Sequence, residues 1–181
     1  VLVATSGDTG SAVANGFLGV EGIHVYVLYP KGKVSEIQEK QFTTLGRNIT
    51  AIEVDGTFDD CQALVKNAFM DEELNAHMQL TSANSINVAR FLPQAFYYFY
   101  AYAQMKRRNL ADNLVVCVPS GNFGNITAGL FGKRMGLPVK RFIAANNRND
   151  IFYQYLKTGQ YNPRPSIATI ANAMDVGDPS N

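Results

Sequence analysis

Two hydrophobic periods alternate along the chain, and this alternation constrains the fold more than any other feature. Short apolar runs rich in β-branched residues, each of about strand length, recur at Val1 to Ala4, Val25 to Tyr29, Ile49 to Val54, Leu114 to Val118 and Arg141 to Ala145. Segments with helical spacing lie between or after them, at Ser11 to Leu18, Ser35 to Leu45, Phe58 to Phe69, Asn87 to Met105 and Asn125 to Met135. This order predicts an α/β fold with open, mostly parallel sheets and helices on both faces.

Residues at the ends of these segments agree with the periodicity. Ser35 followed by Gln38 fits a capping box, and Thr57 precedes two acidic residues that suit a helix N-terminus. Gly46 and Gly136 lie where helix C-terminal caps are expected. The helix boundaries therefore have local chemical signals of their own.

Two segments are apolar on more than one side. The run from Leu114 to Val118 is continuously apolar, which predicts a strand buried on both faces and makes Cys117 a core residue. The helix after Asn87 is apolar or aromatic nearly all round, which predicts a place in the middle of something larger. A cofactor-stacking role for its aromatic side chains is the alternative.

Composition excludes several classes of function. Sixteen basic and fifteen acidic side chains give a net charge of +1, and no charged run is longer than the three residues of Lys106 to Arg108, so a nucleic-acid or anionic-membrane surface is not indicated. The longest apolar stretch is far short of the roughly 20 residues that a membrane span needs. Cys61 and Cys117 form no CxxC motif and have no nearby histidine, which favours a reducing, cytoplasmic setting over a disulfide framework or a zinc site. The expected partner is a small molecule.

The loops after two predicted strands are unusual. In open parallel sheets ligands bind at the carboxyl ends of strands. The segments from Thr5 to Ser11 and from Pro119 to Asn125 follow two of the predicted strands at these ends. Glycine lets backbone N–H groups point inward and a helix N-terminus adds partial positive charge, so both loops are candidate anion sites. The alternative is that their glycines only permit tight turns. Neither loop matches the GxGxxG or GxxxxGK[ST] pattern, which disfavours NAD and ATP.

A third polar cluster, Thr81 to Asn87, precedes the long helix and is followed by Arg90. Helix capping explains one of its residues, Ser85 or Asn87. Arg90 then lies in the first turn, where the helix dipole disfavours a cation. A bound anion would reverse that penalty, which makes Arg90 a candidate phosphate ligand.

These motifs, together with the tail Ala173 to Asn181, resemble the threonine synthase family of pyridoxal-phosphate enzymes, which has the tryptophan synthase β-like (type II) fold. The resemblance runs over essentially the whole chain in the right order. It implies a lyase of threonine biosynthesis that converts O-phospho-L-homoserine and water to L-threonine and phosphate. Asp8, where cysteine synthases and dehydratases usually carry Asn, favours this branch.

The resemblance also implies roles for individual residues and no metal. The coenzyme phosphate would be held by Ser120, Gly121, Asn122, Phe123, Gly124 and Asn125, with Asp8 at the position beside the coenzyme ring. The substrate would be held by Thr5, Ser6, Thr9, Asn84, Ser85 and Arg90.

No lysine in the chain matches the family's Schiff-base lysine, which the resemblance places upstream of Val1. The chain is therefore expected to be an interior segment, with a fold incomplete at both ends and no activity alone. Residues 1–80 would belong to a smaller mobile lobe and residues 81–181 to a larger, coenzyme-phosphate-binding lobe. Two alternatives stay open: a related pyridoxal-phosphate lyase or dehydratase, and a non-catalytic anion-binding module.

Overall fold

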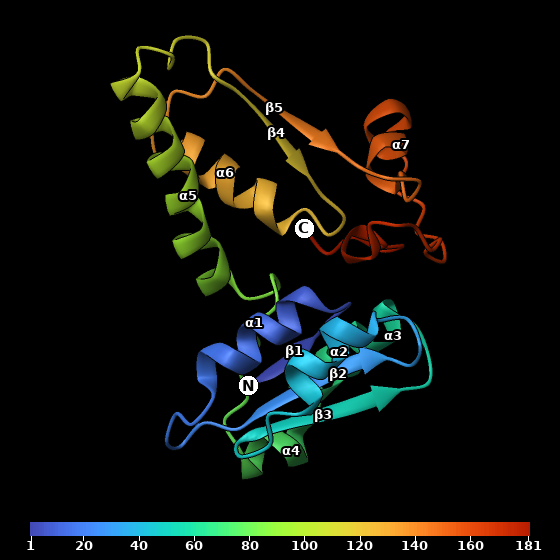
Figure 1. Cartoon of the computed structure of the whole chain (residues 1–181). Coiled ribbons are helices and arrows are strands. Elements are labelled where there is room, and N and C mark those ends of the chain that lie inside the picture. Colours follow the sequence, from blue (N-terminus) through green and yellow to red (C-terminus); the bar gives the residue numbers. More distant parts are fainter. The chain divides into compact units, whose positions relative to one another are not determined.

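A computed structural model describes residues 1–181, which divide into two compact units, 1–84 and 85–181 (Figure 1). The first unit contains β1 (Leu2–Ala4), α1 (Asp8–Phe17), β2 (Val25–Pro30), α2 (Glu36–Thr43), β3 (Ile49–Val54), α3 (Phe58–Met70) and α4 (Glu72–His77). The second contains α5 (Val88–Arg107), β4 (Val115–Pro119), α6 (Gly124–Arg134), β5 (Arg141–Ala145), α7 (Ile151–Thr158) and a short 3-10 helix, η1 (Asn172–Met174). The predicted α/β class is confirmed, and α1 begins three residues before the predicted helix.

The first unit is a three-stranded parallel sheet in the order β1-β2-β3, with helices on both faces. Side chains alternate across the strands, so Val3 and Val27 pack with Phe42 of α2 on one face. Leu28 packs with Val65 of α3 on the other face. Both faces are covered, as expected for a parallel sheet.

The segment after α4 belongs to this sheet. The N–H of Leu2 donates to the carbonyl of Thr81 at 2.8 Å, and the N–H of Ala83 donates to the carbonyl of Leu2 at 3.3 Å. A parallel bridge joins Leu2 and Ser82. The two compact units therefore divide after Asn84, whereas the expected lobe boundary lies at residue 80. The motion of the lobes stays a prediction.

Helix caps follow the local signals. Ser35 and Gln38 form the predicted capping box of α2. Thr57 forms a second box with Asp60, where the sequence had indicated only favourable charge. Hydrogen bonds from Thr57 lower the pKa of the Asp60 carboxyl. Gly136, at φ 102°, lies just beyond the last turn of α6 in a conformation that glycine adopts readily.

The second unit has a two-stranded parallel sheet, β4-β5, that is covered on one face. Val118 packs with Phe123 and Ile126 on the covered face. On the opposite face Val115 is 46% exposed and Cys117 is also exposed. The prediction of a strand buried on both faces, with Cys117 in the core, is therefore wrong for these residues, because no other part of the unit packs over that face.

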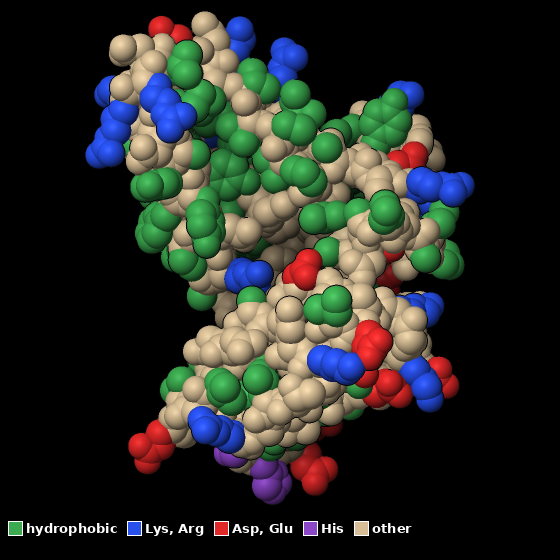
Figure 2. Space-filling model, in the orientation of Figure 1, with side chains coloured by type: hydrophobic (Ala, Val, Ile, Leu, Met, Phe, Trp, Pro, Cys, Tyr) green, Lys and Arg blue, Asp and Glu red, His purple; other side chains and the backbone are tan.

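Helix α5 is likewise covered on one side only. Phe91 and Ala95 pack with Ala128 of α6, whereas Tyr97 and Tyr100 are 74% and 68% exposed. Apolar side chains gather over α5 in the space-filling view (Figure 2). Within these 181 residues the aromatic helix is not enclosed, and its place in the middle of something larger stays a prediction. No helix in the structure has both the length and the apolar character needed to span a bilayer.

Candidate functional site

The two glycine-containing loops occupy the predicted positions. The loop after β1 leads into α1, and the loop after β4 leads into α6, each at the carboxyl end of its strand. The loops belong to different compact units and are described one by one.

Thr5 shapes the first loop from within. Its buried side chain Oγ1 accepts hydrogen bonds from the N–H groups of Gly7, at 2.9 Å, and Gly10, at 2.8 Å. Gly7 has a φ of 136°, which side-chain-bearing residues rarely adopt. Two of the loop's N–H groups are thus satisfied internally, while the first-turn N–H groups of Asp8 and Thr9 have no intrahelical acceptor. The predicted contact of Thr5 with substrate stays a prediction.

Gln38 is a residue of this loop that the sequence identified only as a helix cap. Its Nε2 donates to Oδ1 of Asp8 at 2.8 Å. A Cβ added to Gly7 would lie 2.5 Å from Cδ of Gln38, so glycine at this position lets the amide pack against the loop. Gln38 therefore orients the carboxylate of Asp8 from α2. Ser6 and Thr9 beside it are half-buried.

Asn84 fixes the end of β1. Its Oδ1 accepts from the N–H of Ala4 at 2.8 Å, and its Nδ2 donates to the carbonyl of Ala4 at 2.7 Å. The side-chain amide thus serves as a strand partner for the residue before Thr5. Its predicted contact with substrate phosphate stays a prediction.

The second loop is braced by two polar side chains. Ser120 Oγ donates to Oδ1 of Asn125 at 2.7 Å, and Asn125 Nδ2 donates to the carbonyl of Pro119 at 2.7 Å. These bonds join the end of β4 to the first turn of α6. The hydroxyl of Ser120 therefore donates its hydrogen bond within the loop. Its predicted contact with the coenzyme phosphate stays a prediction.

Phe123 carries the unusual backbone of this loop. It is the N-cap of α6 with φ 61°, a left-handed conformation that is uncommon outside glycine. Its buried ring lies 4.5 Å, between centroids, from Phe152. Packing thus stabilises a conformation that is typical of functional sites.

The donors of this loop suit a phosphate group. The N–H groups of Gly124 and Asn125 lie in the first turn of an eleven-residue helix, at its positive end, where they have no intrahelical acceptor. The N-cap residue Phe123 provides no side-chain cap either. Backbone N–H groups at a helix N-terminus are the usual ligands of a phosphate monoester. The residues present therefore fit the phosphate of pyridoxal phosphate.

Close packing, rather than a turn, explains the two glycines of this loop. Neither Gly121 nor Gly124 has a positive φ. A Cβ on Gly121 would lie 2.6 Å from the carbonyl oxygen of Met174, and one on Gly124 would lie 2.6 Å from Cβ of Ser85. The alternative that these glycines only permit tight turns is therefore wrong.

Ser85 and the tail meet at Asn122. Ser85 Oγ accepts from Nδ2 of Asn122 at 3.1 Å and from Nδ2 of Asn181 at 2.7 Å. Asn122 Oδ1 accepts from the N–H of Ser180 at 2.6 Å. The structure thus joins three motifs that lie far apart in sequence.

Arg90 occupies the first turn of α5, as predicted. The N-cap is Asn87, whose Oδ1 accepts from the N–H of Ala89 at 3.0 Å. Burial lowers the pKa of the Arg90 guanidinium. A cation in the first turn of a helix is electrostatically disfavoured by the helix dipole, and the contact of Arg90 with an anionic ligand stays a prediction.

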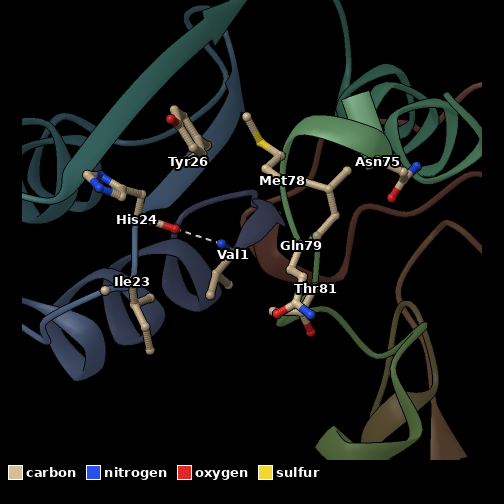
Figure 3. Close-up of a pocket in the computed structure, with 10 residues that line it drawn as sticks. Val1, Ile23, His24, Tyr26, Asn75, Met78, Gln79 and Thr81 are labelled. Atoms are coloured by element: carbon tan, nitrogen blue, oxygen red, sulfur yellow. Dashed lines mark hydrogen bonds between the residues drawn. The ribbon is translucent and has the colours of Figure 1, made fainter. Parts of the chain in front are cut away.

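A cavity of about 730 Å³ lies elsewhere in the first unit (Figure 3). Val1, His24 and Met78 are among its lining residues, and the amino group of Val1 donates to the carbonyl of His24 at 2.6 Å. Val1 and His24 directly precede β1 and β2, at the amino ends of these strands and away from the edge where parallel sheets bind ligands. His24 and His77 are both exposed.

Comparison with known proteins agrees with the site's chemistry. The sequence profile described as "Pyridoxal-phosphate dependent enzyme" matches residues 1–181. The chain belongs to this family.

Its relatives include threonine synthases. The chain is 56% identical to threonine synthase of Haemophilus influenzae over 181 residues, which cover 100% of this chain and 42% of the relative. Among solved structures it is similar to threonine synthase from Escherichia coli, with a TM-score of 0.93 and 54% identity over 99% of this chain and 42% of that one. It is also similar to PLP-bound threonine synthase from Brucella melitensis, with a TM-score of 0.81 and 42% identity over 99% of this chain and 39% of that one.

The chain thus spans 42% of the length of the curated relative from Haemophilus influenzae. The structural match confirms the predicted family fold. The roles of individual site residues remain predictions.

Proposed function

We propose that this chain is part of a threonine synthase, an enzyme that uses pyridoxal phosphate to convert O-phospho-L-homoserine and water to L-threonine and phosphate. The phosphate-binding geometry at the start of α6 is the observation that carries the proposal. The similarity over the whole chain to threonine synthases supports it. The cytoplasmic setting stays part of the proposal.

Each loop has a distinct task in this reaction. Bound pyridoxal phosphate supplies an electron sink. The N–H groups of Gly124 and Asn125 hold the coenzyme phosphate, with Ser120 and Asn125 keeping the loop in shape. In the first unit, Ser6 and Thr9 bind the substrate carboxylate near the N-terminus of α1. Gln38 orients Asp8.

Arg90 distinguishes this function from a related lyase or dehydratase. A substrate that carries phosphate needs a cation with several donors, whereas a serine or threonine substrate does not. A non-catalytic anion-binding module would bind phosphate without turnover.

Growth of a threonine auxotroph tests the proposal. The complete open reading frame that contains this chain is expected to restore growth without threonine. Arg90→Gln is expected to reduce growth more than Arg107→Gln, a matched change on the exposed last turn of the same helix. If the unmodified protein is soluble and folded but the auxotroph does not grow, the proposed function is overturned. Equal growth with the two variants would show that Arg90 is not a substrate-binding residue.

A further inference from the structure

Asp175 is the centre of a polar cluster in the second unit. Its Oδ1 accepts from Nδ2 of Asn147 at 2.8 Å, from Nδ2 of Asn149 at 3.1 Å and from Oγ1 of Thr169 at 2.7 Å. Its Oδ2 accepts from the N–H of Thr169 at 2.8 Å. One carboxylate thus joins the tail to the segment that follows β5.

Asn149 strengthens this junction from the other side. Only 6% of it is exposed. Its Oδ1 accepts from the N–H of Ile167 at 2.7 Å, and its Nδ2 donates to the carbonyl of Ile167 at 2.9 Å and to Oδ1 of Asn147 at 3.0 Å. Because buried polar groups need partners, these contacts fix the tail in one position relative to the end of β5.

The tail fixed in this way packs against the phosphate loop. Met174 is the neighbour of Asp175, and its carbonyl oxygen lies close to Gly121. A Cβ added to Gly121 would be only 2.6 Å from that oxygen. The N–H of Ser120 donates to the carbonyl of Ala145 at 2.8 Å, so the loops after β4 and β5 leave the sheet at the same edge. The position of Asp175 therefore restricts where Gly121 can lie.

We propose that Asp175 is a positioning residue for the phosphate loop. It acts through Met174 by keeping the backbone around Gly121 in the shape that directs the N–H groups of Gly124 and Asn125 outward. This inference rests on the proposed function, because it takes the loop to be the coenzyme-phosphate site.

Titration of the isotope-labelled chain with inorganic phosphate, followed by NMR at Gly121, Gly124 and Asn125, tests the inference. Asp175→Asn keeps the side-chain shape but places an NH₂ group opposite hydrogen-bond donors. It is expected to weaken phosphate binding about tenfold, since hydrogen bonds to a charged group are lost. Amide protection at Ala128 in α6 is expected to stay unchanged.

Asp178→Asn is the matched control. Asp178 is exposed in the same tail and accepts from the hydroxyl of Tyr161 at 2.7 Å, away from the cluster. Its phosphate affinity is expected to stay within about twofold of the unchanged chain. Adding Asn147→Asp to Asp175→Asn reverses the hydrogen bond between these two positions, and we expect it to restore part of the affinity.

The outcomes separate the inference from the proposed function. Unchanged affinity in folded Asp175→Asn, or an equal loss in Asp178→Asn, overturns the role of Asp175 alone. If Asp175→Asn does not fold, Thr169→Val removes one donor to Asp175, and unchanged affinity in that variant also overturns it. No response of the unchanged chain to phosphate contradicts the proposed coenzyme-phosphate site, and the inference falls with it.

Discussion

The side-chain amide of Asn84 pairs with both backbone polar groups of Ala4, although the two residues are 80 positions apart. The pairing extends the edge of the first sheet by one side chain. It also sets where the strand stops and the loop at Thr5 begins.

Asn84→Asp tests this pairing. The change keeps the shape but removes the donor to the carbonyl of Ala4 and buries a charge. We expect a loss of about 2–4 kcal/mol in free energy of unfolding, measured by urea denaturation at neutral pH. Asn162→Asp, at an exposed position, is the control and is expected to change stability by less than about 0.5 kcal/mol. Equal stability of the two variants would contradict the structural role of Asn84.

The hydroxyl of Thr5 gives a second test. Thr5→Val has the same shape but leaves the N–H groups of Gly7 and Gly10 without their acceptor. A loss of about 2–4 kcal/mol in free energy of unfolding is expected. Thr5→Ser keeps the oxygen and is expected to lose less than half as much, so similar losses in the two variants would show that the methyl group, not the hydroxyl, matters.

Glycine substitutions distinguish close packing from backbone conformation. Gly124→Ala is expected to cost about 1–3 kcal/mol, because the new methyl group meets Ser85. In contrast, Gly16→Ala in α1 meets nothing within 4 Å and is expected to stabilise the chain by about 0.5–1 kcal/mol. Thermal unfolding measures both. A neutral Gly124→Ala would mean that the loop moves away from Ser85 without cost.

Local patterns predicted the elements better than the contacts between them. The strands, the capping box of Ser35 and the place of Arg90 in the first turn depend on residues close in sequence, so periodicity and capping chemistry were sufficient. The hydrogen bond from Asn147 to Asp175 joins residues 28 apart, and no local pattern indicates it.

Hydroxyl groups and apolar runs show the same limit. The family resemblance implies that Ser120 helps to hold the coenzyme phosphate, but the direction of its hydroxyl depends on where Asn125 lies in the folded loop. The apolar run of β4 has the composition of a strand that is covered on both faces. Whether each face is covered depends on which other elements pack against it. Cys117 is exposed for that reason.

The two thiols are therefore expected to react differently. Burial raises the pKa of Cys61 to about 12, from an ordinary value of 9.0, whereas Cys117 is exposed. Because the thiolate is the reactive form, iodoacetamide at mildly alkaline pH is expected to modify Cys117 and leave Cys61 unmodified in the folded chain, as read by peptide mass spectrometry. In denaturant both thiols are expected to react, which serves as the control.

The same shift gives a pH dependence of stability. The unfolded chain loses the Cys61 proton near pH 9, before the folded chain does, so this thiol's contribution to stability is complete below about pH 9. It declines as the pH rises from about 9 towards about 12. Cys61→Ala removes the titrating group, and we expect its free energy of unfolding to fall less steeply over this range than that of the unchanged chain. Parallel curves for the two proteins would contradict the raised pKa.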